Sequence, residues 1–410
     1  MKNSHLQIIL ILFFSACAEK PVYLENGVTM SHSGQTIAIE RQTHDPIYAL
    51  YGRHGLLRNV ESTRNSIMVG RLRIINQGSE TVRIKNCVLI FSSKGREYQR
   101  TTLDDAWLER EAKPAYAYLQ SSVVQKFYKA VSFYQGNFTS KIELKTNEAL
   151  PIFNQYFDFY TPEPIDNLEV RCQLADGNQA SSNFKITEYV QKNRYDFPMK
   201  GSDLITFGNP YQIWGHRTMP HAEFGFDVQI LGRNGRVYEG SPSNPNNHFC
   251  MGRSIYAPAD GTVVEVLDGL PDNPKAYNRQ AFTKHFEKLK DQFPAIQLNG
   301  GNMILIDHGN QEYSFLIHLL KNSIRIKKGE QVKRGALLAK CGHSGEGSTS
   351  PHLHFHFGNR SDMLTSTSLP IVFDNVDNRH FSKKILGLIG IPSELSPIFK
   401  EAEVILIQAK

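Results

Sequence analysis

A chain of 410 residues, with 40% hydrophobic and 21% charged residues, has a globular composition and is too long for one ordinary core. Its 46 basic and 40 acidic residues give a formal net charge of only +6, and the basic residues are spread along the chain. Nucleic-acid binding usually needs a basic stripe or cluster, so we expect no nucleic-acid partner.

The first seventeen residues have the pattern of an export signal. A positively charged start precedes an apolar stretch at 6–14, and two small residues come just before Cys17. This nine-residue stretch, apolar except for Gln7, is too short to span a bilayer but suits the apolar region of a signal peptide. "FSAC" resembles the lipobox of bacterial lipoproteins, which implies a signal peptide at 1–16 and a lipid on Cys17; a plain signal peptide is the alternative. We therefore predict an exported protein of the cell envelope, periplasmic or at the outer membrane, anchored to the membrane by this lipid.

Beyond Cys17 there are four cysteines, an even number in a chain that we expect to be exported. Cysteines in an oxidising compartment commonly form disulfides. Two fall in each half of the chain, so we predict the pairs Cys87–Cys172 and Cys250–Cys341. Four buried free thiols are the alternative that the sequence leaves open.

The segment 25–195 predicts an Ig-like β-sandwich domain with an insertion. "MVGRLRIINQ" and "TVRIKNCVLIFSS" alternate apolar and polar residues, and the turn residues between them favour a β-hairpin. "SKIELKT" and "NLEVRCQLADG" continue the strand pattern, whereas the stretch around "DDAWLEREAKPAYAYLQ" is more helical. No cluster of catalytic residue types occurs here, so binding, including binding of a protein partner, is the expected role.

The segment 200–378 predicts a compact antiparallel β domain, because short strands and glycine turns recur along it. An insertion at about 272–297 contains "AFTKHFEKLKDQF", whose apolar spacing is helical. The extension at 379–410 is expected to pack back on this domain. The predicted fold class is therefore mainly β, a sandwich followed by an antiparallel sheet domain with a short helical insertion.

One strand of this second domain carries three histidines at alternate positions, in "PHLHFHF". Side chains two residues apart in a strand point to the same face, so His352, His354 and His356 share a face. The apolar residues between them point the other way, toward a core. Histidines on a strand that is fixed by packing are a suitable base for a metal site.

Two more residues strengthen a metal interpretation. His318 ends the apolar strand "FLIHLL", and Asp227 ends "HAEFGFD", a run rich in aromatic residues. A carboxylate among apolar neighbours is costly unless it is paired or binds a cation. An aspartate and histidines from separate strands, with one position left for water, form a sound zinc site.

The second half resembles the lysostaphin-type zinc endopeptidases, the LytM family of cell-wall hydrolases, over about 205–375. The matching text is "APADGTVVEV", "GNMILIDHGNQEYSFLIHL", "VKRGALLAKCGHSG" and "SPHLHFHF", in the family's order. The resemblance implies that Asp227 and His354 bind zinc. It also implies that His318 and His352 are catalytic, one helping to deprotonate water and the other stabilising the oxyanion.

The chain departs from the family at the first zinc ligand. The family pattern "HxGxD" has a histidine four residues before the aspartate, and this chain has Glu223 there. Three residues compete for the role: His216, which resembles the placement in a divergent branch of the family, then His221, then Glu223. We favour them in that order.

The predicted function is that of an exported zinc metalloendopeptidase that hydrolyses peptide bonds, with the stem or cross-bridge peptides of peptidoglycan as the substrate implied by the family. The altered "HxGxD" position motivates an alternative. In it the chain is a metal-free protein that binds the cell wall or activates other wall hydrolases on the same scaffold.

Overall fold

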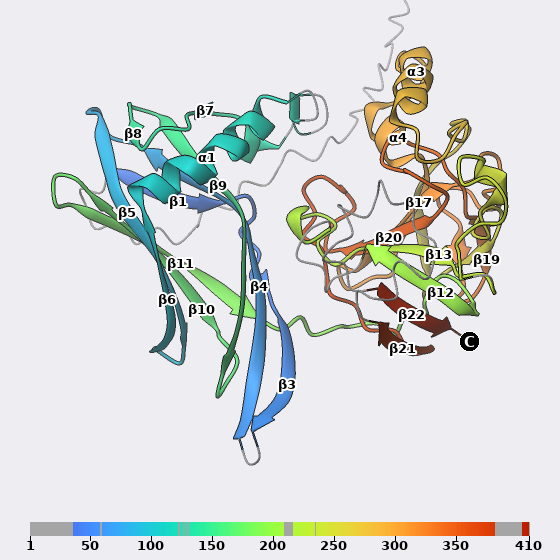
Figure 1. Ribbon diagram of the computed structural model, residues 1–410, viewed down its shortest axis with the longest axis horizontal. Coiled ribbons are helices and arrows are strands. Elements are labelled where there is room, and N and C mark those ends of the chain that lie inside the picture. The colour runs from blue at the N-terminus through green and yellow to red at the C-terminus, as the bar shows by residue number, and fades with distance from the viewer. Residues whose placement is uncertain are drawn as a thin grey trace, which may run out of the picture.

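The computed structural model describes residues 36–57, 60–121, 124–125, 128, 131–208, 216–233, 235–381 and 404–409. Two β-rich halves lie side by side, with the N-terminal half on the left of Figure 1. Strands far outnumber helices, so the prediction of a mainly β fold is confirmed. The exact domain boundaries stay a prediction.

The predicted signal peptide and Cys17 lie outside the described residues. Over the ranges that are described, no helix is both long and apolar enough to cross a membrane.

The N-terminal half consists of two sheets that face each other across a shared core. The first sheet contains β1 (Ile37–Arg41), β3 (Leu50–Leu57), β4 (Val60–Asn76), β7 (Asn137–Phe138) and β9 (Glu148–Thr161). The second contains β2 (Ile47–Tyr48), β5 (Val82–Ser93), β6 (Arg96–Asp104), β8 (Glu143–Leu144), β10 (Asn167–Leu174) and β11 (Gln179–Thr187).

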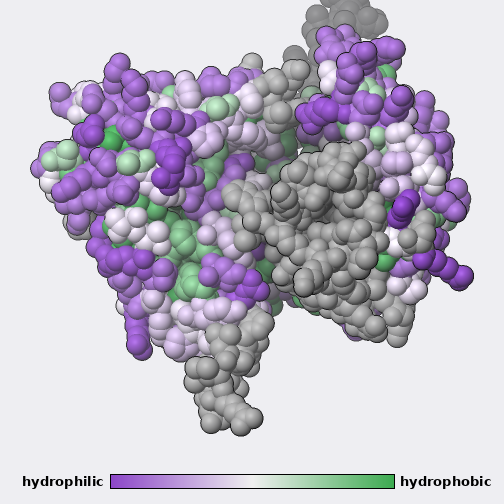
Figure 2. All heavy atoms as spheres, in the orientation of Figure 1, coloured by the Kyte–Doolittle hydropathy of each residue, from purple (hydrophilic) through white to green (hydrophobic). Residues whose placement is uncertain are grey.

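The core of this sandwich follows from the alternation along its strands. Leu168, Val170 and Cys172 of β10 are all buried, while the residues between them are only partly buried. In Figure 2, hydrophilic residues cover most of the visible face of this half, with small hydrophobic patches among them. The apolar side chains therefore lie mainly between the sheets.

Helix α1 (Asp105–Leu119) leaves the second sheet directly after β6 and packs on β9 of the first. It begins where Asp104 accepts a hydrogen bond from the Trp107 amide at 2.8 Å, which is a standard N-cap. A short 3-10 helix, η1 (Ser132–Tyr134), follows.

The predicted hairpin at the start of this half is wrong. β4 pairs with β1, β3 and β9, whereas β5 pairs with β6, β8 and β10, so the two strands belong to different sheets. The turn residues between them carry the chain across the core. Alternation indicates which face of a strand is buried, but not which strand lies beside it.

One of the two predicted disulfides is present. Cys87 and Cys172 are opposite residues in the antiparallel pair β5–β10, and their sulfur atoms are bonded at 2.04 Å. The predicted Cys250–Cys341 bond is wrong, because both thiols are free and buried in the core of the second half. Burial and the neighbouring Cys250 thiol raise the pKa of Cys341 well above its usual value, which keeps it protonated.

The second half is built on one nine-stranded sheet. Its strands, in spatial order, are β18 (Gln331–Val332), β15 (Gly261–Leu267), β16 (Asn302–Asp307), β17 (Tyr313–Leu319), β20 (Leu353–Gly358), β13 (Phe226–Ile230), β12 (Gly201–Gly208), β22 (Val404–Ala409) and β21 (Val376–Phe381). A separate pair is formed by β14 (Ser254–Tyr256) and β19 (Leu337–Lys340).

The predicted helical insertion contains α3 (Arg279–Leu289) and α4 (Ala295–Gly300). In α3 the buried residues Phe282, Phe286 and Leu289 recur at helical spacing and form its inner face. Two 3-10 helices, η2 (His216–Thr218) and η3 (Pro245–Asn247), lie in the loops. Strand β22 of the predicted extension pairs with β12.

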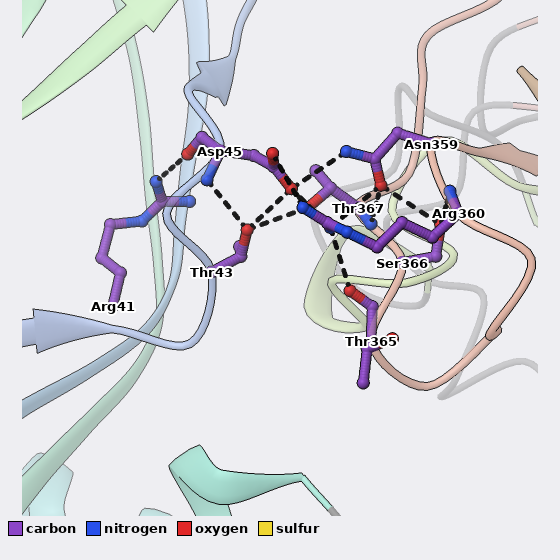
Figure 3. A network of polar contacts seen from close by, with 8 residues as sticks. All are labelled: Arg41, Thr43, Asp45, Asn359, Arg360, Thr365, Ser366 and Thr367. Carbon is purple, nitrogen blue, oxygen red and sulfur yellow. Dashed lines mark hydrogen bonds and ion pairs between the residues drawn. The ribbon is translucent and has the colours of Figure 1, made fainter. Parts of the chain in front are cut away.

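A polar network joins the halves away from the sheets (Figure 3). Asp45 of the N-terminal half accepts hydrogen bonds from Arg360 at 2.8 Å, Thr367 at 2.6 Å and Asn359 at 3.0 Å. Partial burial raises the pKa of Asp45, but these donors outweigh it and hold the pKa well below its usual range. The carboxylate is therefore ionised at neutral pH and connects the two halves.

Thiol counting tests the cysteine assignment. In a Cys17→Ser variant, denatured without reductant, we expect two reactive thiols, from Cys250 and Cys341, and four after reduction. No reactive thiol before reduction would mean that Cys250 and Cys341 are bonded.

Replacing Cys87 and Cys172 by alanine should lower the free energy of unfolding by about 2–5 kcal/mol, because it removes a crosslink from the unfolded chain.

The Asp45 network predicts a pH-dependent contribution to stability. The folded pKa lies below the unfolded value, so the contribution is present above about pH 4 and is lost as the pH falls further. Asp45→Asn should lower the free energy of unfolding at pH 7 by about 1–3 kcal/mol, and by less at pH 3. Urea unfolding at both pH values measures this. The exposed control Glu80→Gln should change little, and a pH-independent loss in Asp45→Asn would contradict the assignment.

Candidate metal centre

Three neighbouring strands carry Asp227, His318 and His354. Asp227 of β13 is directly opposite His354 of β20, and His354 is also opposite Ile317 of β17. Residues opposite each other in antiparallel strands have their side chains about 4.5–5.5 Å apart. Register alone therefore places the carboxylate beside the imidazole.

The alternation in "PHLHFHF" is present in the structure. Leu353, Phe355 and Phe357 belong to the core of the second half, while His354 and His356 face the other side. His352 comes just before β20 and lies on the histidine side as well. The stack of Phe355 on Phe226, with ring centroids 5.3 Å apart, fixes the strand from behind.

Three of the predicted residues converge on one point. Nitrogen atoms of His216 and His354 and a carboxylate oxygen of Asp227 all lie within 4.8 Å of one another. His354 Nδ1 is 2.9 Å from Asp227 Oδ1, and His216 Nε2 is 3.4 Å from Asp227 Oδ2. One carboxylate and two imidazoles are groups that zinc accepts.

His216 reaches this point from η2, outside the sheet. Successive tight turns follow it, with the Met219 amide donating to His216 O at 2.7 Å and the Ala222 amide to Met219 O at 2.8 Å. These turns bring the chain back to β13. The Nε2 atom of His216 faces Asp227, and its Nδ1 atom is buried without a hydrogen-bond partner.

Gly208, which was not among the predicted site residues, leaves room for the side chains of Asp227 and His216. Gly208 of β12 is opposite Asp227, and a Cβ atom built on it would lie 2.5 Å from Asp227 Oδ2 and 2.7 Å from His216 Cε1. Any side chain at this position would displace the carboxylate or the imidazole. The sequence did contain a signal for this role, because a glycine inside a strand often marks a place where another group approaches the backbone closely.

The two alternates for the first ligand lie elsewhere. Glu223 is 3.1 Å from Arg217 Nε, in a buried ion pair that points away from the cluster. His221 lines the same cavity as the cluster, but its Nδ1 atom is 3.5 Å from the hydroxyl of Tyr128. Neither belongs to the group formed by His216, Asp227 and His354.

The electrostatics of the cluster depend on Asp227. Burial raises the pKa of this carboxyl, but the neighbouring His216 and His352 imidazoles outweigh it and hold the pKa well below its usual range. The same carboxylate raises the pKa of His352, against the opposing effect of burial. Asp227 is therefore ionised and is the negative charge around which the imidazoles gather.

A β-bulge turns His318 toward the cluster. β17 has one more residue than β16 between their paired positions, and His318 has a φ of 63°. Bulges and left-handed residues at such places re-aim side chains and cost energy, which is characteristic of functional sites. The ring centroid of His318 lies 4.7 Å from that of His352.

Backbone carbonyl oxygens determine which ring nitrogen is protonated in His318 and in His352. His318 Nδ1 lies 2.8 Å from Ser344 O, and His352 Nδ1 lies 2.7 Å from Ser350 O. A carbonyl oxygen only accepts, so each ring carries a proton on Nδ1, and His352 Nε2 lies 3.4 Å from Asp227 Oδ1. Burial and the neighbouring His352 and His354 lower the pKa of His318 well below its usual value, so its Nε2 is a free acceptor.

These side chains lie in the wall of a cavity of about 970 Å³. The second half contributes the histidines and Asp227, with Asn299 and Met363. The N-terminal half contributes Arg71 of β4, Tyr118 of α1, Phe153 to Tyr156 of β9, and Tyr128. Both halves therefore shape the space next to the cluster.

The fold and the site define a β-sheet protein whose central strands carry a carboxylate and imidazoles at the wall of a cavity. Residues 248–365 match the model of peptidase family M23. The chain therefore carries an M23 domain of the LytM or lysostaphin type. The match includes His318, His352 and His354, whereas His216 and Asp227 precede it.

Solved structures of similar proteins come from several bacteria. A zinc-containing peptidase from Vibrio cholerae is 16% identical, with 75% of this chain and 81% of that chain covered and a TM-score of 0.26. The catalytic domain of lysostaphin from Staphylococcus simulans is 20% identical, with 32% and 88% covered and a TM-score of 0.19. The M23 protein EnpA from Enterococcus faecalis is 19% identical, with 42% and 92% covered and a TM-score of 0.24. No curated protein matches the chain.

The Arg217–Glu223 pair gives a prediction about stability. Glu223→Ala leaves the Arg217 guanidinium, which is 1% exposed, without this partner, and should cost about 3–5 kcal/mol of unfolding free energy. The double variant Arg217→Met, Glu223→Leu removes both charges and should cost clearly less. Urea unfolding of the single and double variants measures the difference. Equal losses would show that the pair is not energetically coupled.

Proposed function

We propose that this chain is an exported zinc metalloendopeptidase that cleaves peptide bonds in the stem or cross-bridge peptides of peptidoglycan. The observation that carries the proposal is the convergence of His216, Asp227 and His354 within 4.8 Å at the wall of a cavity. Its M23 domain supports the hydrolase class.

The residues fit a zinc ion. They offer one oxygen and two nitrogen ligands, a set that zinc accepts, and one ring nitrogen of His216 is buried without a hydrogen-bond partner. Zinc held by three protein groups, with its fourth position open, lowers the pKa of water there and polarises a carbonyl group.

His318 and His352 supply the proton chemistry in this proposal. His318 holds its proton at Nδ1, so its Nε2 can accept a proton from the attacking water and later donate it to the leaving amine. His352, whose pKa Asp227 raises, can donate a hydrogen bond from Nε2 to the oxygen that becomes negative. The two rings are adjacent, so both can act on one peptide bond.

The proposed location follows from the first seventeen residues, whose signal-peptide and lipobox pattern would place the domain in the cell envelope, facing peptidoglycan. A lipid on Cys17 would hold it at a membrane. The metal-free alternative, a protein that binds the wall or activates other hydrolases, would use the same scaffold without hydrolysis.

Zinc content and digestion of purified peptidoglycan test the proposal together. Wild-type protein should hold about one zinc ion per chain and release peptides with new amino groups. His216→Ala and His354→Ala should lose both zinc and hydrolysis. The matched control is His221→Ala, a buried histidine of the same cavity, which should keep its zinc.

A third variant separates chemistry from metal binding. His318→Ala should keep its zinc but lower kcat by about 10²–10⁴-fold, because it removes the proton acceptor alone. Zinc-free wild-type protein that does not digest peptidoglycan would support the activator instead. Retention of zinc in His216→Ala would exclude His216 as a ligand.

A further inference from the structure

Arg71 of the N-terminal half lies in the wall of the cavity that holds the metal cluster. It comes from β4 and is 6% exposed. Two aromatic rings flank its guanidinium, with Phe153 at 4.5 Å and Tyr118 at 5.1 Å from ring centroid to Cζ. The group is therefore held in a defined orientation at the cavity wall.

The polar contacts of Arg71 are with neutral groups. Its Nη1 donates to Asn154 Oδ1 at 2.6 Å and its Nη2 donates to the carbonyl oxygen of Thr218 at 3.1 Å. Its Nε is buried without a hydrogen-bond partner. Within the part of the chain that the structure describes, no carboxylate forms an ion pair with this guanidinium.

Other arginines near Arg71 form ion pairs with carboxylates. On the same strand, Arg73 pairs with Glu40 at 2.7 Å and Arg64 pairs with Asp158. Arg217, also buried, pairs with Glu223. A buried charge is costly without a counter-charge, so the missing partner of Arg71 needs an explanation.

We propose that Arg71 and its aromatic neighbours Tyr118 and Phe153 form a subsite for a carboxylate of the substrate peptide. This inference rests on the proposed peptidase function and names the chemistry that its substrate would need. A guanidinium binds carboxylates through paired, charge-assisted hydrogen bonds, and Arg71 has N–H groups beyond those that Asn154 and Thr218 accept.

The position of the subsite relative to the cluster follows from Thr218. Its carbonyl oxygen accepts from Arg71, and it lies two residues after His216 in the same 3-10 helix. Arg71 therefore lies beside the segment that carries His216, in the wall of the same cavity as the cluster. Arg71 would thereby select for an acidic group close to the cleavage point.

Matched peptide substrates test this inference. Soluble cross-linked peptides from peptidoglycan are prepared with their carboxylates free, with only the C-terminal carboxylate converted to an amide, and with only the side-chain carboxylates converted. Wild-type protein should show kcat/KM about ten- to a hundredfold higher for the free peptide than for one amidated form. Which form loses activity identifies the source of the carboxylate.

Arg71→Met should abolish this preference by lowering kcat/KM for the free peptide to the value for the amidated one. Any loss of kcat/KM that follows from the broken contact with Thr218 should be the same for both peptides, so the ratio of their kcat/KM values should fall to about one. The control Arg73→Met, on the same strand but paired with Glu40, should keep the preference. If Arg71→Met lowers kcat/KM equally for all peptides and loses zinc, Arg71 only supports the His216 segment and the inference is wrong.

Calorimetric binding separates this inference from the proposed function. The free peptide should bind wild-type protein at least tenfold more tightly than the amidated peptide, and Arg71→Met should bind both alike. Binding of this kind without any cleavage would reject the peptidase proposal but leave the subsite. Cleavage of both peptides with equal kcat/KM by wild-type protein would reject the subsite but leave the peptidase.

Discussion

A single carboxylate, that of Asp227, organises the centre of this protein. It lies between β12 and β20, opposite Gly208 on one side and His354 on the other, so strand register fixes its position. A partly buried negative charge is stable only beside positive or hydrogen-bonding groups, and the histidines around it meet that need. The sheet, the glycine and the imidazoles therefore depend on one another through this group.

The N-terminal half takes part in the site as well as lying beside it. Arg71 holds the carbonyl of Thr218, and Arg217 donates to Ser66 of β4 while lying over the Tyr156 ring of β9. Both contacts fix the short segment that carries His216. The sandwich thus supports the divergent residue of the cluster, and it also forms one wall of the cavity.

Much of the second half could be predicted from the sequence, because its signals are local. Alternation in "PHLHFHF" gives the histidine face, and helical spacing gives α3. Contacts between distant segments could not be predicted. The pairing of β4 and β5, the free thiols of Cys250 and Cys341, and the role of Arg71 each depend on which segments meet, and no local pattern contains that information.

The side chain of Glu223 has a consequence for anyone who would redesign this centre. The family pattern has a histidine at the position that Glu223 occupies in this chain. Here the side chain of Glu223 forms an ion pair with Arg217. A histidine at this position would remove the carboxylate partner of Arg217, and position 223 does not belong to the group formed by His216, Asp227 and His354. Restoring the family's pattern at this single position would therefore break a buried ion pair without taking over the place of His216 beside Asp227.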